Sequence, residues 1–146
     1  MRNKAADKIS CAPSDAAHPG MALFSALARE LGVWLLAGSF GVREAGAERL
    51  FNRSALFDAA GQRVAIYDKI HLFDVDLPTG ESRRESEAVT PGARAVVTPS
   101  PWGKIGLSIC YDVRFASLYR ALAQAGAKIL TVPAAFTVPT GQAHWE

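Results

Sequence analysis

The sequence predicts an α/β fold, because stretches with strand character alternate with stretches that have helical spacing. Residues 104–110 read as a strand, residues 115–125 place apolar side chains at helical intervals, and residues 128–133 read as the next buried strand. This strand, helix, strand order is typical of α/β proteins. Cys110 stands at the first junction, where the strand ends and a helix is expected to begin within a few residues.

Residues 21–31 are predicted to form an amphipathic helix. Leu23, Leu27 and Leu31 recur at every fourth position, which puts their side chains on one helical face. Gly32 follows them, at the position where glycine commonly ends a helix. The leucine face is therefore expected to be the face that packs on the rest of the domain.

The middle of the chain predicts strands and one long loop. Residues 33–40 form a nearly continuous apolar run, as expected of a strand covered on both faces. Residues 53–58 and 63–69 predict a hairpin whose turn contains Gly61. Residues 74–92 are rich in charged residues, proline and glycine and have no periodicity. A loop of this length inside a compact domain is usually functional.

Composition indicates one soluble globular domain and excludes several classes of protein. The 146 residues are 49% hydrophobic and 21% charged, so the chain resembles neither a disordered nor a fibrous protein. The net charge of +2 comes from 16 basic and 14 acidic residues scattered along the sequence. Without a basic stripe or a polybasic run, neither a nucleic acid nor a membrane surface is a predicted partner.

The two cysteines, Cys11 and Cys110, lie in very different contexts, which gives no sign of a disulfide framework. Residues 1–7 include basic side chains, but the apolar segment of a secretory signal does not follow them. We therefore expect a reducing, cytoplasmic location.

Cys110 is the first candidate for a catalytic residue. A thiol at the start of a helix lies near backbone N–H groups that have no partner within the helix. The positive end of the helix dipole favours the thiolate, and the same N–H groups can receive an oxyanion. The alternative is an inert cysteine in a buried strand, which is common for this residue type. Position alone does not distinguish the two interpretations.

Four sequence blocks resemble, in order and spacing, the nitrilase superfamily of carbon-nitrogen hydrolases, and most of all its Nit-type amidases. The blocks are YDKIHLFD at 67–74, GLSICYDVRF at 106–115, PAAFT at 133–137 and AHWE at 143–146. Any one block alone is weak, but the combination is highly specific. The resemblance implies a nitrilase-like α-β-β-α sandwich, in which two sheets pack face to face with helices outside.

The resemblance also implies a catalytic set of glutamate, lysine and cysteine. Cys110 matches the nucleophile and Lys69 matches the lysine, whose ammonium would stabilise negative charge in the transition state. Glu85 matches a further acidic residue that family members place near the lysine. The alternatives are a solvated lysine at a strand end and a loop glutamate pointing to water. Glu81 and Glu87 lie close enough to be confused with Glu85.

Other residues of these blocks are given supporting roles by the resemblance. Tyr111 is expected to contribute its backbone N–H to the oxyanion hole, and Asp112 and Arg114 to support the turn that carries the nucleophile. His71 is expected to be a structural neighbour of Lys69, although a histidine could also transfer protons. His144 is expected at a packing or subunit contact. Neither a metal nor an organic cofactor is implied.

The chain departs from the family pattern at both ends. The family's general base is a glutamate at the end of an early strand, and no apolar strand occurs before Met21. Residues 1–146 are therefore interpreted as a single partial carbon-nitrogen hydrolase domain, an incomplete sandwich that lacks the first strand with its glutamate and the C-terminal half.

The predicted function is thiol-dependent hydrolysis of a small amide, such as an ω-amide of a dicarboxylic acid, through a cysteine thioester with release of ammonia. Residues 74–78 and 143–146 resemble the amidase branch. The alternatives are a nitrilase or an N-carbamoyl hydrolase on the same scaffold, or a catalytically dead module retained for binding. The missing glutamate favours the dead module, whereas the presence of Lys69 and Cys110 opposes it. The resemblance also implies a homo-oligomer for the full-length protein.

If Cys110 lies at a helix N-terminus, it should react with iodoacetamide much faster than Cys11 near neutral pH, because only the thiolate is nucleophilic. Mass spectrometry of the two alkylated peptides from the folded full-length protein measures both rates. Equal rates would contradict an activated Cys110.

Overall fold

A computed structural model describes residues 9, 12–76, 80 and 82–145 of the chain. The helices are α2 (Pro19–Leu31), α3 (Ala116–Gln124) and α4 (Val138–Trp145), and the 3₁₀ turns are η1 (Glu85–Glu87) and η2 (Cys110–Arg114). The strands are β1 (Leu35–Val42), β2 (Phe51–Phe57), β3 (Arg63–Asp68), β4 (Asp74–Asp76), β5 (Ser82–Arg84), β6 (Val96–Thr98), β7 (Lys104–Leu107) and β8 (Ala127–Thr131).

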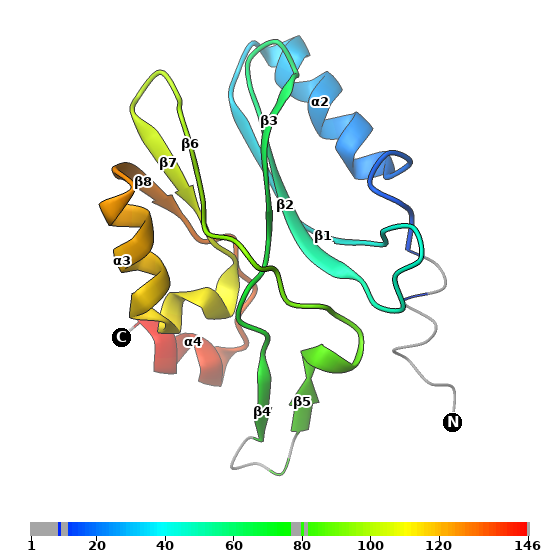
Figure 1. The fold of residues 1–146 in the computed structure, drawn as a ribbon, viewed down its shortest axis with the longest axis vertical. Helices are drawn as coiled ribbons and strands as arrows, with labels where there is room; N and C mark the ends of the chain where they lie inside the picture. Colours follow the sequence, from blue (N-terminus) through cyan, green and yellow to red (C-terminus); the bar gives the residue numbers. More distant parts are fainter. Residues whose placement is uncertain (1–8, 10–11, 77–79, 81, 146) are drawn as a thin grey trace.

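Two three-stranded sheets pack face to face between two helices, as Figure 1 shows. The first sheet has the order β1-β2-β3, the second has the order β6-β7-β8, and β4 and β5 form a separate short pair. Helix α2 covers the outer face of the first sheet, and α3 covers that of the second. The predicted α/β class and its α-β-β-α layering are confirmed in the described part of the chain.

The first sheet is antiparallel and contains the predicted hairpin of β2 and β3. Its turn is closed by the Asp58 side chain, which accepts hydrogen bonds from the backbone of Ala60 at 2.9 Å and of Gln62 at 2.8 Å. Gly61 has a φ of 75° and lies so close to Ser25 on α2 that a Cβ atom would collide with the backbone there. Only glycine satisfies both requirements.

Helix α2 packs through a different face from the one that the leucine spacing predicted. Met21 and Ala28 are buried against the first sheet, with Phe24 beside them, whereas Leu23 is 62% exposed and Leu31 is 59% exposed. The small Ala28 side chain lets the helix approach the sheet closely, Leu23 and Leu31 face outward, and Leu27 is half-buried. The predicted end of the helix is confirmed, because Gly32 adopts a left-handed φ of 63°.

The second sheet confirms the predicted strand, helix, strand order. Strand β6 pairs antiparallel with β7, and β7 pairs parallel with β8 after the crossover through α3. Two details of the prediction were wrong. Strand β7 ends at Leu107, before Cys110. Strand β8 is not fully buried, since Ile129 is 38% exposed and Leu130 is 45% exposed. The two side chains point to opposite faces of β8, which is an edge strand of its sheet, so neither is fully covered by the described residues.

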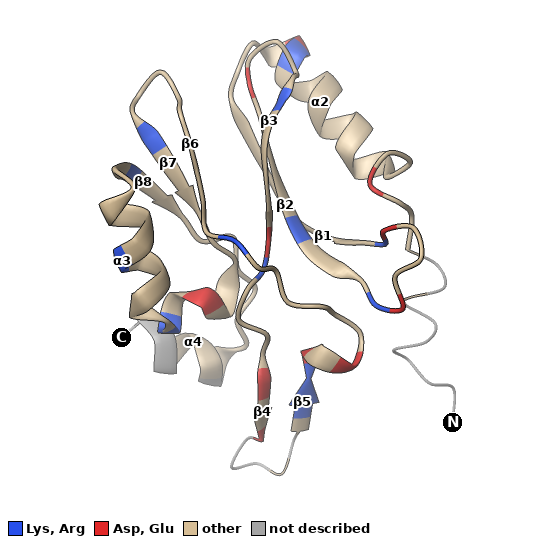
Figure 2. Cartoon of the chain, in the orientation of Figure 1, with Lys and Arg blue, Asp and Glu red and all other residues tan. Residues whose placement is uncertain are grey.

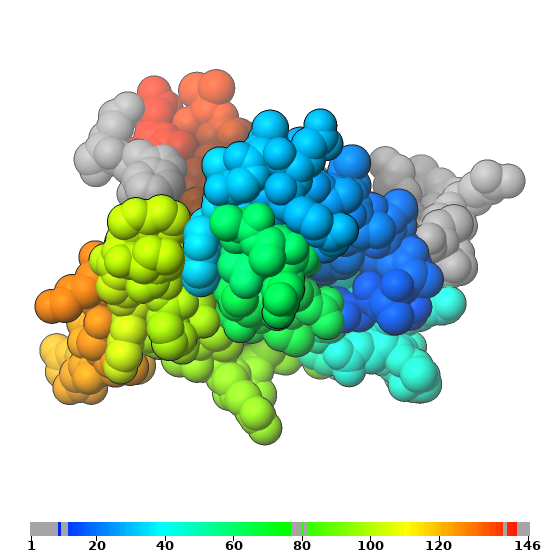
Figure 3. Space-filling view, turned by 90° about the horizontal axis from the view of Figure 1, so that it is seen from above, coloured from blue at the N-terminus to red at the C-terminus, as the bar shows by residue number. Residues whose placement is uncertain are grey.

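The core between the sheets is apolar. It joins Leu56 and Tyr67 of the first sheet to Ile105 and Leu107 of the second and to Ile109, which follows β7. Burial of apolar surface on the inner faces is the main force that holds the layers together. At one end of the sandwich Trp34 meets Trp102 edge-on, with ring centroids 6.0 Å apart. Figure 3 looks onto this end, where the β2–β3 and β6–β7 turns lie beside each other.

A buried carboxylate also links the two sheets. Asp112, in η2, is fully buried and accepts hydrogen bonds from the Tyr67 hydroxyl at 2.7 Å and from the Ile109 N–H at 2.9 Å. Its other oxygen accepts from the His71 N–H at 3.0 Å and lies 2.7 Å from His71 Nδ1. Burial, followed by the hydrogen bond to Asp112, raises the pKa of Tyr67, so the phenol remains a donor at neutral pH.

The segment 74–92 is more ordered than its composition predicted. Strands β4 and β5 pair antiparallel, and η1 follows directly. Figure 2 shows acidic residues on β4 beside basic residues on β5. Arg84 holds Asp76 with two hydrogen bonds of 2.7 and 2.8 Å, which closes the pair. Figure 2 also shows basic residues dispersed over the elements.

Helix α4 was not predicted from the sequence. Among the described residues, every helix is too short or too polar to cross a lipid bilayer.

The substitution Asp112→Asn should lower the free energy of unfolding by about 3 kcal/mol. Each carboxylate oxygen of Asp112 faces two donor groups, and the NH₂ group of an amide would replace one oxygen and face two of these donors. Urea unfolding measures the loss. Asp74→Asn, at an exposed position, is the matched control and should cost much less. Equal losses for the two variants would show that the buried carboxylate has no special structural role.

Candidate active site

Cys110 is the first residue of η2, the 3₁₀ turn that follows β7. Its φ of 50° is in the left-handed region, where non-glycine residues are rare and where strain often marks a functional position. The Cys110 N–H donates to the carbonyl of Pro133 at 3.0 Å, which ties the turn to the segment after β8. The residue is partly exposed, so the interpretation of an inert cysteine inside a buried strand does not fit the structure.

Lys69 directly follows β3, and its side chain is only 3% exposed. Its ammonium donates to Glu85 Oε2 at 2.5 Å. The alternative of a solvated lysine is therefore wrong, because a buried ammonium needs a counter-charge. The preceding carboxylate, Asp68, is bound by the Arg53 guanidinium through contacts of 2.7 and 2.9 Å. This hydrogen bonding to Asp68 raises the pKa of Arg53, against the opposing effect of burial.

Glu85 is held by three donors. Oε2 accepts from Lys69 and from the Phe73 N–H, the latter at 2.7 Å, and Oε1 accepts from Asn52 Nδ2 at 3.0 Å. The side chain is 18% exposed, which excludes a loop glutamate pointing to water. Of its rivals, Glu87 is exposed and borders a different cavity. Glu81 lies outside the described residues.

The backbone around Lys69 is fixed from two sides. Its N–H donates to the carbonyl of Asn52 at 2.9 Å, and its carbonyl accepts from the Gly92 N–H at 2.8 Å. A Cβ atom at Gly92 would collide with the backbone of Asp68, so this approach requires glycine. The end of the long segment 74–92 therefore lies against the end of β3, the strand that precedes this segment.

Cys110, Lys69 and Glu85 border one cavity of about 370 Å³. Gly38 and Ser39 of β1 form part of its wall, and the segment after β8 forms another part. The volume suits a small molecule. The structure therefore brings the three predicted catalytic residues, which are separated by up to 41 positions in the sequence, to one space.

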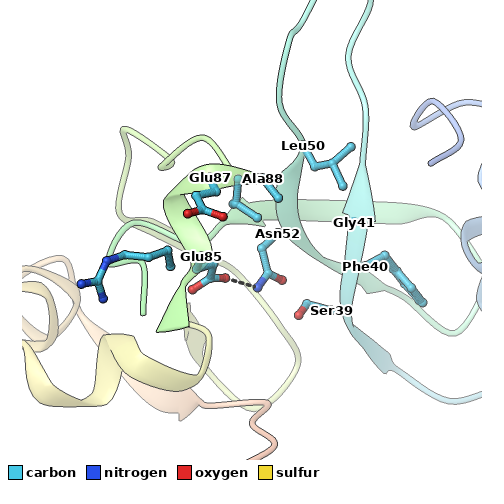
Figure 4. A pocket seen from close by; sticks show the side chains of 10 residues that line it. Ser39, Phe40, Gly41, Leu50, Asn52, Glu85, Glu87 and Ala88 are labelled. Carbon is cyan, nitrogen blue, oxygen red and sulfur yellow. Dashed lines mark hydrogen bonds between the residues drawn. The ribbon is translucent and has the colours of Figure 1, made fainter. Parts of the chain in front are cut away.

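Two further cavities adjoin this one. A cavity of about 500 Å³ shares Ser39, Asn52 and Glu85 with it, and Figure 4 shows the hydrogen bond between Asn52 and Glu85 at its wall. A cavity of about 280 Å³ shares Cys110 and Ala135 with it. Cys110 therefore borders two cavities, those of about 370 and 280 Å³.

Aromatic rings pack beside the turn that carries Cys110. The Tyr111 ring lies edge-on to Phe73 and to Phe115, with centroid distances of 4.9 and 5.4 Å. The His71 ring stacks on Phe115 at 3.7 Å, and its Nδ1 faces Asp112. These contacts agree with a structural role for His71. Arg114 is exposed at the end of η2.

The oxyanion-hole role of the Tyr111 N–H stays a prediction, as do the roles of Asp112 and Arg114 in supporting the turn. The side chain of His144 and the whole of Cys11 lie outside what the structure describes. Within the described residues, no three histidine, cysteine or acidic side chains cluster as metal ligands.

Sequence reasoning missed Asn52, because the hairpin was predicted to begin at Arg53. The available signal was a carboxamide side chain near the start of a strand whose other residues are mostly apolar. Its antiparallel neighbour Lys69 could be identified only with the register, in which Arg53 pairs with Asp68.

Comparison with known proteins agrees with this geometry. The family model described as carbon-nitrogen hydrolase matches residues 7–146. The deaminated glutathione amidase of Yersinia enterocolitica is 45% identical over 122 residues, which cover 82% of this chain and 43% of that protein. The human omega-amidase NIT2 is 42% identical over 122 residues, covering 84% of this chain and 44% of that protein. The chain thus spans less than half the length of these relatives.

The fold has close counterparts among solved structures. Saccharomyces cerevisiae Nit3, described as a member of the nitrilase superfamily, superposes with a TM-score of 0.79 and 29% sequence identity. The superposition covers 94% of this chain and 48% of Nit3. The sequence resemblance and the predicted fold are both confirmed. The chain belongs to the carbon-nitrogen hydrolase family of the nitrilase superfamily, and within it to the Nit branch.

Proposed function

We propose that this site hydrolyses the amide bond of a small molecule with Cys110 as its nucleophile. The observation that carries the proposal is the shared cavity, on whose wall the Cys110 thiol and the buried ammonium of Lys69 both lie. Relatives at 42% and 45% identity are named as amidases, which favours an amide over a nitrile substrate.

The proposed reaction has two halves. The sulfur of Cys110 attacks the amide carbonyl, a C–S bond forms, and the oxygen becomes an oxyanion. Lys69 Nζ and the Tyr111 N–H stabilise this charge. The C–N bond then breaks, and the nitrogen leaves as ammonia after receiving the thiol proton. Water attacks the resulting thioester, which releases the carboxylic acid and restores the thiol.

Glu85 supports Lys69 in this mechanism and does not act as the general base. Both of its oxygens already accept hydrogen bonds, from Asn52, Lys69 and Phe73. Its charge balances the buried ammonium and fixes Nζ beside the cavity. The resemblance assigns the general base to a glutamate of an early strand, for which no counterpart was found in the sequence.

The proposed substrate class is an ω-amide of a dicarboxylic acid, as the names of the omega-amidase and the deaminated glutathione amidase suggest. A cytoplasmic location and a homo-oligomeric full-length protein also remain proposals. Exposed Leu23 and Leu31 on the outer face of α2 support association through the helical layer.

The full-length protein should release ammonia faster from the ω-monoamide of a dicarboxylic acid than from the corresponding nitrile, and Cys110→Ala should abolish release from both. A coupled ammonia assay measures the rates at matched concentrations. Faster turnover of the nitrile would overturn the amidase proposal.

Glu85→Gln should lower kcat for amide hydrolysis by about 10²-fold, because Lys69 loses its counter-charge and its fixed position beside the oxyanion. Glu87→Gln, two residues further along η1, is the matched control and should stay within about twofold of the wild type. Steady-state kinetics and thermal unfolding of both variants separate lost catalysis from lost folding. A Glu85→Gln enzyme that is folded and fully active would refute the supporting role.

A further inference from the structure

We propose that Arg83 forms a subsite for the anionic end of the substrate, beside Cys110. This inference rests on the proposed amidase function and deepens it. The observation behind it is the cavity of about 280 Å³ that is bordered by both Arg83 and Cys110. A substrate whose amide carbon lies at the sulfur can extend into this cavity toward the guanidinium.

The lining of this cavity fits a short aliphatic chain that ends in a carboxylate. Phe73 and Phe136 supply apolar contact surface, and Thr137 and Thr140 add hydroxyl groups. Among its described lining residues, Arg83 is the one with a charged side chain. A guanidinium can bind a carboxylate with two parallel hydrogen bonds, which gives direction as well as affinity.

The neighbouring Arg84 borders a different cavity from Arg83. Successive residues of a strand point to opposite faces, so Arg83 and Arg84 of β5 face different ways. Arg84 borders the cavity of about 500 Å³ and binds Asp76 through two hydrogen bonds. Arg83 pairs in register with Val75 and borders the cavity that contains the nucleophile.

The charges around the other two cavities disfavour an anionic group there. The cavity of about 370 Å³ contains one ammonium, Lys69, and its charge is balanced by Glu85. The cavity of about 500 Å³ is bordered by two carboxylates, Glu85 and Glu87, and by one guanidinium, that of Arg84. Like charges repel strongly in a partly desolvated space. The Arg83 cavity is therefore the favoured place for the anionic end.

The first test compares an anionic with a neutral amide in the full-length protein. Succinamate and butyramide have the same chain length, and the ratio of their kcat/KM values measures anion selectivity. Arg83→Ala should lower this ratio about tenfold or more, mainly through KM, because a charge-assisted hydrogen bond is lost. Arg83→Lys should recover part of it. Arg84→Ala, the matched control, should leave the ratio unchanged.

A second test separates this inference from the proposed function. Calorimetry on the Cys110→Ala protein measures succinamate binding without turnover, and adding Arg83→Ala should weaken this binding about tenfold. Absence of amide hydrolysis in the wild type would defeat the proposed function while this binding difference still supported the subsite. Unchanged binding and an unchanged selectivity ratio, or a ratio shifted by Arg84→Ala instead, would overturn the subsite.

Discussion

The burial of one ammonium group is the constraint on which the rest of this site depends. Lys69 carries its charge into the interior, and such a charge is tolerated only beside a counter-charge with further hydrogen bonds around it. Glu85 supplies the carboxylate, and Asn52 and the backbone of Phe73 supply the further donors. The segment between Lys69 and Glu85 must therefore return to its starting point, which explains why a stretch with no periodicity is ordered as a paired loop.

A buried carboxylate, that of Asp112, lies at the centre of a second hydrogen-bond network, close to Cys110. Asp112 receives donors from Tyr67 and His71 on one side and from Ile109, next to Cys110, on the other. These hydrogen bonds connect the residue before Cys110 with the segment around the end of β3, which is followed by Lys69. The two sheets contribute one reactive group each, and a polar network at their junction sets the relation between them.

The charged side chains are distributed unevenly between the two cavities that Cys110 borders. In one cavity beside Cys110 the positive charge of Lys69 is balanced by the carboxylate of Glu85, whereas in the other Arg83 borders a mostly apolar space. A substrate with an amide at one end and an anion at the other has one favourable orientation in such a field. Under this proposal Arg83 binds the anionic end of the substrate, and Lys69 stabilises the oxyanion that forms at the amide carbon.

The sequence by itself determined the layer types, the β2–β3 hairpin and the family, because periodicity, turn residues and local motifs are properties of short segments. It also singled out Cys110 and Lys69 by their motif blocks. Only the tertiary structure decided which of three nearby glutamates is paired with the lysine, and which face of α2 is buried. Those outcomes depend on how distant strands and helices pack against each other, and neither residue spacing nor composition encodes contacts across the layers.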